Sequence, residues 1–196
     1  VTSRGAVVEL TDSGKYYSRS SYDIYVNGEK FINTDKVITS LHGLKPDTEY
    51  NITAEFEGNT YGPVNVKTNY EYVTLNVREF GAVGDGEHDD TNAIQCAIMA
   101  CPKDSRVLVP EGIFRITSLL LKDDLTLELA KGATLLAFTD REKFPILPGL
   151  IQSYDETDEY NLGTWEGNPL DSFSAIICGI NVKNVCITGE GTIDGN

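Results

Sequence analysis

The sequence predicts an all-β protein in which a small β-sandwich is followed by the first coils of a solenoid, with one short α-helix near the junction. Two patterns support this prediction. In the first third, short runs of β-branched and aromatic residues are separated by Gly, Asn and Asp. In the remainder, short apolar strands recur after a single helical stretch. The expected domains are residues 1–70 and 71–196.

The net charge supports this division. Residues 1–70 carry seven basic and nine acidic residues, whereas residues 71–196 carry nine and twenty-one. The whole chain has a formal charge of −14, which repels phosphate backbones and anionic lipid, so nucleic-acid and membrane partners are not expected. No apolar run approaches the roughly 18–20 residues of a bilayer span, and the start of the chain lacks a signal-peptide pattern.

The first domain is expected to be a sandwich of short strands. They are predicted at residues 6–10, 22–26, 36–40, 50–56 and 61–68. Asn27-Gly28 predicts a two-residue hairpin, because a type I′ turn needs positive φ at both central residues. Residues 44–50 (LKPDTEY) resemble the tyrosine corner of fibronectin type III domains, in which a Tyr hydroxyl bonds to the backbone ahead of its strand. This resemblance covers about residues 1–68 and implies a spacer or packing partner.

A strand at residues 73–77 and a glycine-rich loop at residues 81–86 are expected to precede a helix at residues 92–100, which ends before Pro102. Asp89 or Asp90 is predicted to cap this helix, because an Asp oxygen can accept orphan amide protons of the first turn. The apolar residues expected on its buried face are Ile94, Ala97, Ile98 and Cys101.

From residue 106 onward short apolar strands recur, separated by small or charged turns. They are predicted at residues 107–109, 113–116, 119–121, 125–129 and 133–137, and the pattern resumes at 175–177, 185–188 and 192–193. Such coils bury their apolar side chains on the coils above and below. Residues 138–174 interrupt them with three prolines, and residues 155–171 hold six acidic residues and no basic one. We interpret residues 138–174 as a long excursion from the coil, of the kind that often carries function.

The four cysteines are not expected to form a disulfide framework. Cys96 and Cys101 fall in the helical stretch, and Cys178 and Cys186 in strand-like sequence. Buried free thiols are therefore expected. No Cys-x-x-Cys pair exists and the two histidines lie far from the thiols in sequence, so we expect no metal site.

Three segments carry a family resemblance. Residues 76–95 (NVREFGAVGDGEHDDTNAIQ) resemble the opening of the pectate lyase-like β-helix superfamily. Residues 109–114 (VPEGIF) and 187–195 (ITGEGTIDG) narrow this to family 28 glycoside hydrolases, the polygalacturonases, from about residue 73 to the end. A fibronectin-like domain ahead of such a helix further resembles bacterial exo-acting polygalacturonases. The resemblance implies a right-handed parallel β-helix that hydrolyses α-1,4-galacturonan with inversion and needs no cofactor.

The catalytic residues that the resemblance implies are not expected in this chain. In the family, the motifs Asn-Thr-Asp, Asp-Asp, Gly-His-Gly and Arg-Ile-Lys follow the segment matched by residues 187–195, and the present sequence extends only to Asn196. The 196 residues alone are therefore expected to be inactive and to self-associate through the open end of the last coil.

Three internal matches to these motifs have structural interpretations. Asn33-Thr34-Asp35 is expected in a turn between strands of the first domain, Asp89-Asp90 precedes a helix, and Asp123-Asp124 sits in a turn. The acidic, glycine-rich stretch at residues 81–90 lacks the spacing of a phosphate loop or of a calcium loop, so neither ligand is expected there.

Trp165 and Glu166, within the excursion, are the candidate substrate-binding residues. Trp165 is the only tryptophan, and its indole either stacks on a sugar ring or is a buried anchor for the excursion; the anchor is the favoured interpretation. Nearby acidic residues would repel galacturonate at close range; these are Asp155, Glu156, Asp158 and Glu159. The excursion is therefore expected to narrow one end of the cleft and favour attack at chain ends.

The expected partner is galacturonan or an oligogalacturonide. Two alternatives remain open: a non-catalytic β-helix module of the adhesin or tail-spike type, and a calcium-dependent pectate lyase. The family resemblance implies an extracellular or periplasmic location, while reduced cysteines leave the cytosol open.

Overall fold

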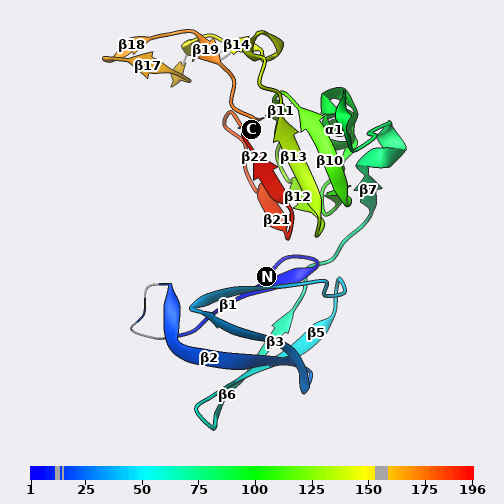
Figure 1. Cartoon of the computed structure of the whole chain (residues 1–196), viewed down its shortest axis with the longest axis vertical. Coiled ribbons are helices and arrows are strands. Elements are labelled where there is room, and N and C mark those ends of the chain that lie inside the picture. The colour runs from blue at the N-terminus through cyan, green and yellow to red at the C-terminus, as the bar shows by residue number, and fades with distance from the viewer. Residues whose placement is uncertain (12–13, 15, 153–158) are drawn as a thin grey trace. The chain divides into compact units, whose positions relative to one another are not determined.

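A computed structural model describes residues 1–11, 14, 16–152 and 159–196, and the chain divides into two compact units, Val1–Tyr72 and Val73–Asn196 (Figure 1). The described residues are mostly in strands, with one α-helix in the second unit. Strands pair antiparallel in the first unit and parallel in the coils of the second. Within the described ranges, no helix has the length and apolar character needed to cross a bilayer.

The first unit has two antiparallel sheets. Its strands are β1 (Gly5–Glu9), β2 (Tyr17–Val26), β3 (Glu29–Lys36), β4 (Ile38–His42), β5 (Glu49–Phe56) and β6 (Asn59–Lys67). One sheet pairs β1 with β4, and the other has the order β3-β2-β5-β6. Strand β3 was not predicted as a separate strand, because its sequence is polar and exposed and lacks the alternation of a half-buried strand.

Two local predictions for this unit are confirmed. Asn27 and Gly28 have φ values of 53° and 82°, so the β2–β3 hairpin turns with positive φ at both central residues. The Tyr50 hydroxyl accepts a hydrogen bond from the backbone N–H of Lys45 at 2.8 Å. This bond ties the start of β5 to the preceding connection, as a tyrosine corner does.

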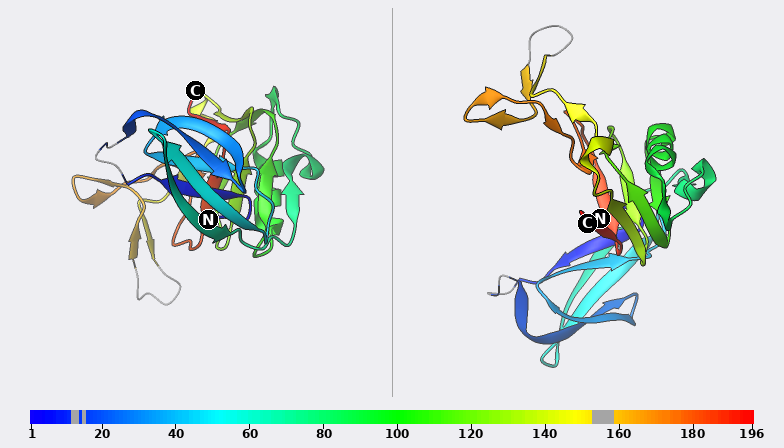
Figure 2. Two further views of the ribbon diagram at one scale, coloured as in Figure 1. Left: turned by 90° about the horizontal axis from the view of Figure 1, so that it is seen from below. Right: turned by 45° about the horizontal axis from the view of Figure 1, so that its top comes forward.

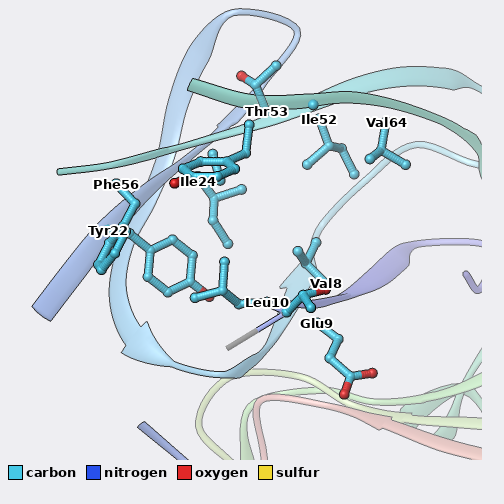
Figure 3. A pocket seen from close by; sticks show the side chains of 13 residues that line it. Val8, Glu9, Leu10, Tyr22, Ile24, Ile52, Thr53, Phe56 and Val64 are labelled. Carbon is cyan, nitrogen blue, oxygen red and sulfur yellow. The ribbon is translucent and has the colours of Figure 1, made fainter. Parts of the chain in front are cut away.

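The core of the first unit includes Tyr22, Ile24 and Leu41, all at most 2% exposed. Beside it lies an apolar cavity of about 380 Å³, shown in Figure 3. Leu10, Tyr22 and Phe56 are among the side chains that line it. The cavity is lined by residues of β1, β2, β5 and β6 and of the chain after β1, and thus lies between the two sheets.

The second unit winds through successive coils of parallel strands. In chain order its coil elements are β7 (Thr74–Asn76), η1 (Val77–Phe80), β8 (Asp85–Asp89), α1 (Thr91–Ala100), β9 (Arg106–Val109), β10 (Gly112–Ile116), β11 (Leu119–Leu120), β12 (Thr126–Leu129), β13 (Ala133–Ala137), β20 (Ile177–Cys178), β21 (Cys186–Gly189) and β22 (Thr192–Asp194). The sheet orders are β21-β12-β9-β7, β22-β13-β10-β8 and β11-β20. Each coil therefore contributes strands to the same parallel sheets as its neighbours.

Apolar side chains stack from coil to coil. Leu127 aligns with Val107 on one side and with Ile187 on the other, and Leu135 aligns in the same way with Phe114 and Ile193. Val107, Phe114, Leu127 and Leu135 are fully buried. Burial of each such side chain stabilises the fold by roughly 1.5–3 kcal/mol, so the repeated apolar pattern is what holds the coils together.

The helix α1 lies where predicted and buries the predicted face. Ile94, Ala97, Ile98 and Cys101 are each 0% exposed. The glycine-rich loop prediction is wrong in part, because Asp85–Asp89 forms β8 and pairs with β10 through Ile113 and Arg115. The edge of β10 offers backbone hydrogen-bond partners to residues 85–89. The polar sequence of β8 does not predict this pairing.

The predicted excursion leaves the coil after β13 and returns before β20. It contains η2 (Arg141–Lys143), β14 (Ile146–Leu147), β15 (Leu150–Gln152), β16 (Glu159–Asn161), β17 (Thr164–Trp165), β18 (Asn168–Pro169) and β19 (Ser172–Phe173). The strands pair antiparallel as β14–β19, β15–β16 and β17–β18. The β15–β16 and β17–β18 hairpins follow one another between β14 and β19, and the right view of Figure 2 shows the excursion extending outside the coils.

The four cysteines are free thiols. Cys101 is buried, Cys178 and Cys186 are half-buried, and Cys96 is exposed. The expected burial is therefore wrong for Cys96, which lies outside the apolar stripe of α1. Burial raises the pKa of the Cys101 and Cys186 thiols.

Candidate functional site

Trp165 and Glu166 lie at the end of the β17–β18 hairpin. Trp165 pairs with Asn168, and Glu166 and Gly167 form the two-residue turn with φ values of 49° and 83°. The Trp165 side chain is 68% exposed, so the favoured interpretation of a buried anchor is wrong. A two-stranded ribbon has no second layer behind it, and an indole on it therefore remains in solvent. Its neighbours Asp155, Glu156 and Asp158 lie outside the described residues, and Glu159 is exposed in β16.

The internal motif matches have structural roles, but one of them does not lie in the turn that was expected. Asn33-Thr34-Asp35 lies within β3 of the first unit, where the Asn33 amide donates to the Asp23 carboxylate at 2.5 Å, so the prediction of a turn between strands is wrong. Asp123-Asp124 lies in the turn before β12. The Asp123 carboxylate accepts from the backbone N–H of Lys183 at 2.7 Å, in the turn of the next coil.

Asp89 and Asp90, which precede α1, bind different parts of the backbone. Asp89 accepts from the backbone N–H and the hydroxyl of Thr91 at 3.0 and 2.6 Å. Asp90 is 2% exposed, and its carboxylate accepts from the backbone N–H groups of Val83 and Gly84 at 2.6 and 3.0 Å. The prediction of a cap is therefore wrong for the Asp90 side chain, which holds the glycine-rich loop and makes no bond to the first helical turn.

The exposed part of this loop is held by Asp85. Its carboxylate accepts from the backbone N–H groups of Glu87 and His88 and lies 2.6 Å from Nδ1 of His88. The backbone bond from His88 is the main reason that the pKa of the Asp85 carboxyl is lowered, and the bond to Asp85 raises the pKa of His88. In the described ranges, no group of three or more His, Cys, Asp or Glu residues could hold a metal ion.

A cavity of about 480 Å³ lies where the excursion leaves and rejoins the coils. Its lining includes Phe138, Arg141, Phe144, Phe173, Ser174 and Asn196. Residues 138–144 come from the chain after β13, Phe173 and Ser174 from the end of β19 and the residue after it, and Asn196 from the end of the last coil. The cavity therefore combines aromatic walls with a guanidinium, a hydroxyl and an amide.

Two cations flank the Phe138 ring at this cavity. The Arg115 guanidinium carbon lies 4.3 Å from the ring centroid, and the Lys143 ammonium nitrogen lies 4.0 Å from it. Arg115 projects from the outer face of β10, next to the inward-facing Phe114 and Ile116. Both contacts fall within the roughly 6 Å range of cation–π attraction.

This cluster could not be predicted from the sequence, because β10 and η2 are distant in the chain. Residues 138–144 (FTDREKF) carried the available signal, since two aromatics bracket a stretch in which two acidic and two basic residues alternate. The structure does not bring Trp165 or Glu166 into the lining of the cavity.

Parallel strands stacked coil on coil, closed by one helix at the first coil, define the class of this protein as a pectate lyase-like β-helix. Residues 74–133 match the family described as rhamnogalacturonase A/epimerase, pectate lyase-like. The chain has this β-helix fold, and its relatives include family 28 exopolygalacturonases.

Two relatives support that statement. The chain is 35% identical over 162 residues to the exo-poly-alpha-D-galacturonosidase of Dickeya chrysanthemi, with 80% of this chain and 26% of the relative covered. The solved structure of the Yersinia enterocolitica family 28 exopolygalacturonase superposes with a TM-score of 0.64 at 25% identity, covering 100% of this chain and 39% of that one. The chain thus spans about a quarter to two fifths of the length of these relatives.

A third relative has a different name. The chain is 41% identical over 75 residues to the plasmin and fibronectin-binding protein A of Streptococcus pneumoniae, with 36% of this chain and 10% of the relative covered.

Proposed function

We propose that this chain is the N-terminal part of a glycoside hydrolase that cleaves α-1,4-galacturonan from its chain ends with inversion. The supporting observation is the likeness to exo-acting polygalacturonases, which extends over 80% of this chain in sequence and all of it in structure. The substrate is an acidic polysaccharide or an oligogalacturonide.

The proposal includes the fold type of each of the two domains. Residues 1–70 form a fibronectin type III-like sandwich, supported by the Tyr50 bond to Lys45 and by the two antiparallel sheets. Residues 71–196 form the beginning of a right-handed parallel β-helix, supported by the in-register stacking of its coils. The first unit acts as a spacer or packing partner.

The hydrolytic residues lie in the part of the protein that the relatives have beyond the matched segment. An inverting enzyme needs two carboxyl groups about 6.5–9.5 Å apart, one as general acid and one to activate water. The paired aspartates of the second unit are engaged with backbone and turn groups: Asp90 with Val83 and Gly84, and Asp123 with Lys183. These 196 residues alone therefore release no product.

The excursion acts at one end of the substrate cleft. The β17–β18 hairpin presents Trp165, 68% exposed, and Glu166 in its turn. An exposed indole has the apolar face on which a sugar ring stacks, and the Glu166 carboxylate can accept bonds from sugar hydroxyls. By narrowing the cleft, the excursion favours attack at chain ends.

Reducing-sugar release from polygalacturonate tests the proposal. The 196-residue chain should release none, and the longer gene product that contains it should release monomer or dimer of the inverted anomer, followed by proton NMR. In that product, deletion of residues 151–168 should shift the products toward longer oligomers. Activity of the short chain, or an unchanged product profile after the deletion, would contradict these statements.

The second candidate function is a non-catalytic β-helix module, and the identity shared with the pneumococcal protein favours it. Sequencing beyond Asn196 separates the two. Asn-Thr-Asp followed by Asp-Asp and Gly-His-Gly supports the hydrolase, whereas their absence supports the module.

A further inference from the structure

The two sheets of the first unit have unequal widths. The sheet formed by β1 and β4 has two strands, and it packs on the four-stranded sheet β3-β2-β5-β6. Among the described residues β1 pairs only with β4, so one of its two edges is open. The inner faces of the two sheets of a sandwich cover each other, and a narrower sheet therefore leaves part of the wider one uncovered.

The uncovered part is the inner face of β6. Val64 lies opposite the buried Ile52, and Tyr61 lies opposite Ala54, which packs on the same core. Val64 is nevertheless 59% exposed and Tyr61 50% exposed. Both line the apolar cavity of about 380 Å³ between the sheets, which Val8 of β1 lines as well (Figure 3). A further strand beside β1 would cover this cavity.

The backbone of β1 offers hydrogen bonds along its open edge. The N–H of Leu10 donates to the C=O of Val37 at 2.8 Å and so continues the pairing with β4. Along an antiparallel strand the backbone groups of successive residues point to alternate edges, so those of Val7 and Glu9 point away from β4. Within the ranges that the structure describes, neither residue has a backbone partner on that side. Such a row of unpaired N–H and C=O groups is a template for another strand.

The first residues of the chain turn back toward the same edge. The N–H of Thr2 donates to the C=O of Gly5 at 2.8 Å, which closes a tight turn ahead of β1. Gly5 precedes Val7 by two residues, so its C=O belongs to the edge that points away from β4. The turn therefore directs a residue ahead of Val1 along the open edge of β1, antiparallel to that strand.

We propose that β1 is completed by a third strand, an extended segment of the same polypeptide that lies ahead of Val1. The added strand runs antiparallel to β1, bonds to the backbone of Val7 and Glu9, and places alternate apolar side chains in the cavity over Val64 and Tyr61. Because side chains alternate between the two faces of a strand, a segment of about five residues supplies about two or three of them. The inference concerns the first unit alone and does not rest on the proposed function.

The turn at the start of the chain favours this occupant over a strand from a second copy of the protein. A tethered strand meets the open edge at a high effective concentration, whereas a second copy has to associate from solution. Thr2 already binds the first position of the edge through the C=O of Gly5, so a second copy finds only part of the edge free.

Amide hydrogen exchange followed by NMR tests the inference on two chains. One is the 196-residue chain, and the other is the same chain extended at its start by the residues that precede Val1 in the longer gene product. In the 196-residue chain the N–H groups of Val7 and Glu9 should exchange freely, while that of Leu10 is protected by its bond to Val37. In the extended chain, exchange at Val7 and Glu9 should slow at least about tenfold, with little change at Leu10.

Two results of the exchange measurement would overturn the inference. The first is equal exchange of Val7 and Glu9 in the two chains, which would show that the preceding segment does not pair with β1. The second is protection of both N–H groups already in the 196-residue chain. If that protection grows with protein concentration, a second copy fills the edge.

Val64→Thr locates the added strand, because Thr keeps the branched shape of Val and adds a hydroxyl that is costly only when it is buried. The substitution should lower the thermal midpoint of the first unit by several degrees in the extended chain and by less than about one degree in the 196-residue chain. Val7→Thr is the matched control and should change neither midpoint, since Val7 is 61% exposed on the outer face of β1. Equal shifts for Val64→Thr in the two chains would show that the segment ahead of Val1 does not cover Val64.

Discussion

The side-chain amide of Gln95 on α1 pairs with the backbone of Leu120 on β11 in both directions. Its Nε2 donates to the Leu120 carbonyl at 2.9 Å, and its Oε1 accepts from the Leu120 N–H at 2.8 Å. The other edge of β11 pairs with β20. Because α1 occupies the position where the first coil would carry its third strand, Gln95 gives β11 the two bonds of a missing neighbour and closes that sheet edge.

Gln95→Ala should lower the free energy of unfolding of the second unit by about 1–2 kcal/mol, because two hydrogen bonds to Leu120 are lost and water replaces them only in part. Urea denaturation followed by circular dichroism measures it. The control is Asn92→Ala on the exposed face of the same helix, with a change within about 0.5 kcal/mol. Equal effects of the two substitutions would contradict the role of Gln95.

Asp90→Asn should cost more, about 1.5–3 kcal/mol, because one carboxylate oxygen that accepts from Val83 or Gly84 becomes an NH₂ group facing a donor. The same denaturation measurement applies. Asp104→Asn is the matched control, since Asp104 is exposed with φ of 55° and Asn tolerates this left-handed conformation. A loss as small as that of the control would show that the buried carboxylate does not hold the loop.

The parallel coils could be predicted because their apolar residues keep a local period. Val107, Leu127 and Ile187 each lie in a short apolar strand, and stacking such strands is the way to remove all of them from water. The buried face of α1 followed for the same reason from the spacing of Ile94 and Ile98. Patterns fixed by burial of neighbouring residues are therefore readable from sequence.

The features that were missed depend on distant partners. Strand β8 is polar and becomes a strand because β10 offers an edge, and the Asp90 carboxylate turns to amides six and seven residues before it. The Phe138 cluster joins Arg115 to Lys143 across 27 intervening positions of the chain. No local period encodes such contacts. The exposure of Trp165 was also missed, because the hairpin that carries it has no second layer of structure to cover the indole.

The Asp85–His88 pair should make the second unit sensitive to pH. The pKa of His88 is raised, so its contribution to stability is full below the unfolded value of about 6.5 and is lost as the pH rises through the folded value. The pKa of Asp85 is lowered, so its contribution is present above about 3.9 and is lost as the pH falls through the folded value. The pair is therefore most stabilising between these limits.

NMR titration of the His88 ring measures this coupling. In Asp85→Asn the pKa of His88 should fall toward its ordinary value, because the bond to the carboxylate is its largest cause of elevation. Glu87→Gln should lower the pKa of His88 only slightly, since the charge of Glu87 contributes least to the elevation of that pKa. An unchanged His88 pKa in Asp85→Asn would show that the pair does not form in solution.

Trp165→Ala should leave the stability of the second unit within about 0.5 kcal/mol of the parent chain, because the indole is 68% exposed and its removal opens no cavity. Phe114→Ala is the contrasting variant and should cost about 3–5 kcal/mol, since Phe114 is fully buried between coils. Trp165 is the only tryptophan, so tryptophan fluorescence measures the exposure of this one side chain. Acrylamide should quench this fluorescence almost as strongly in the folded chain as in urea. A shielded indole together with a loss comparable to that of Phe114→Ala would restore the interpretation of Trp165 as a buried anchor and remove the hairpin from the proposed contact with substrate.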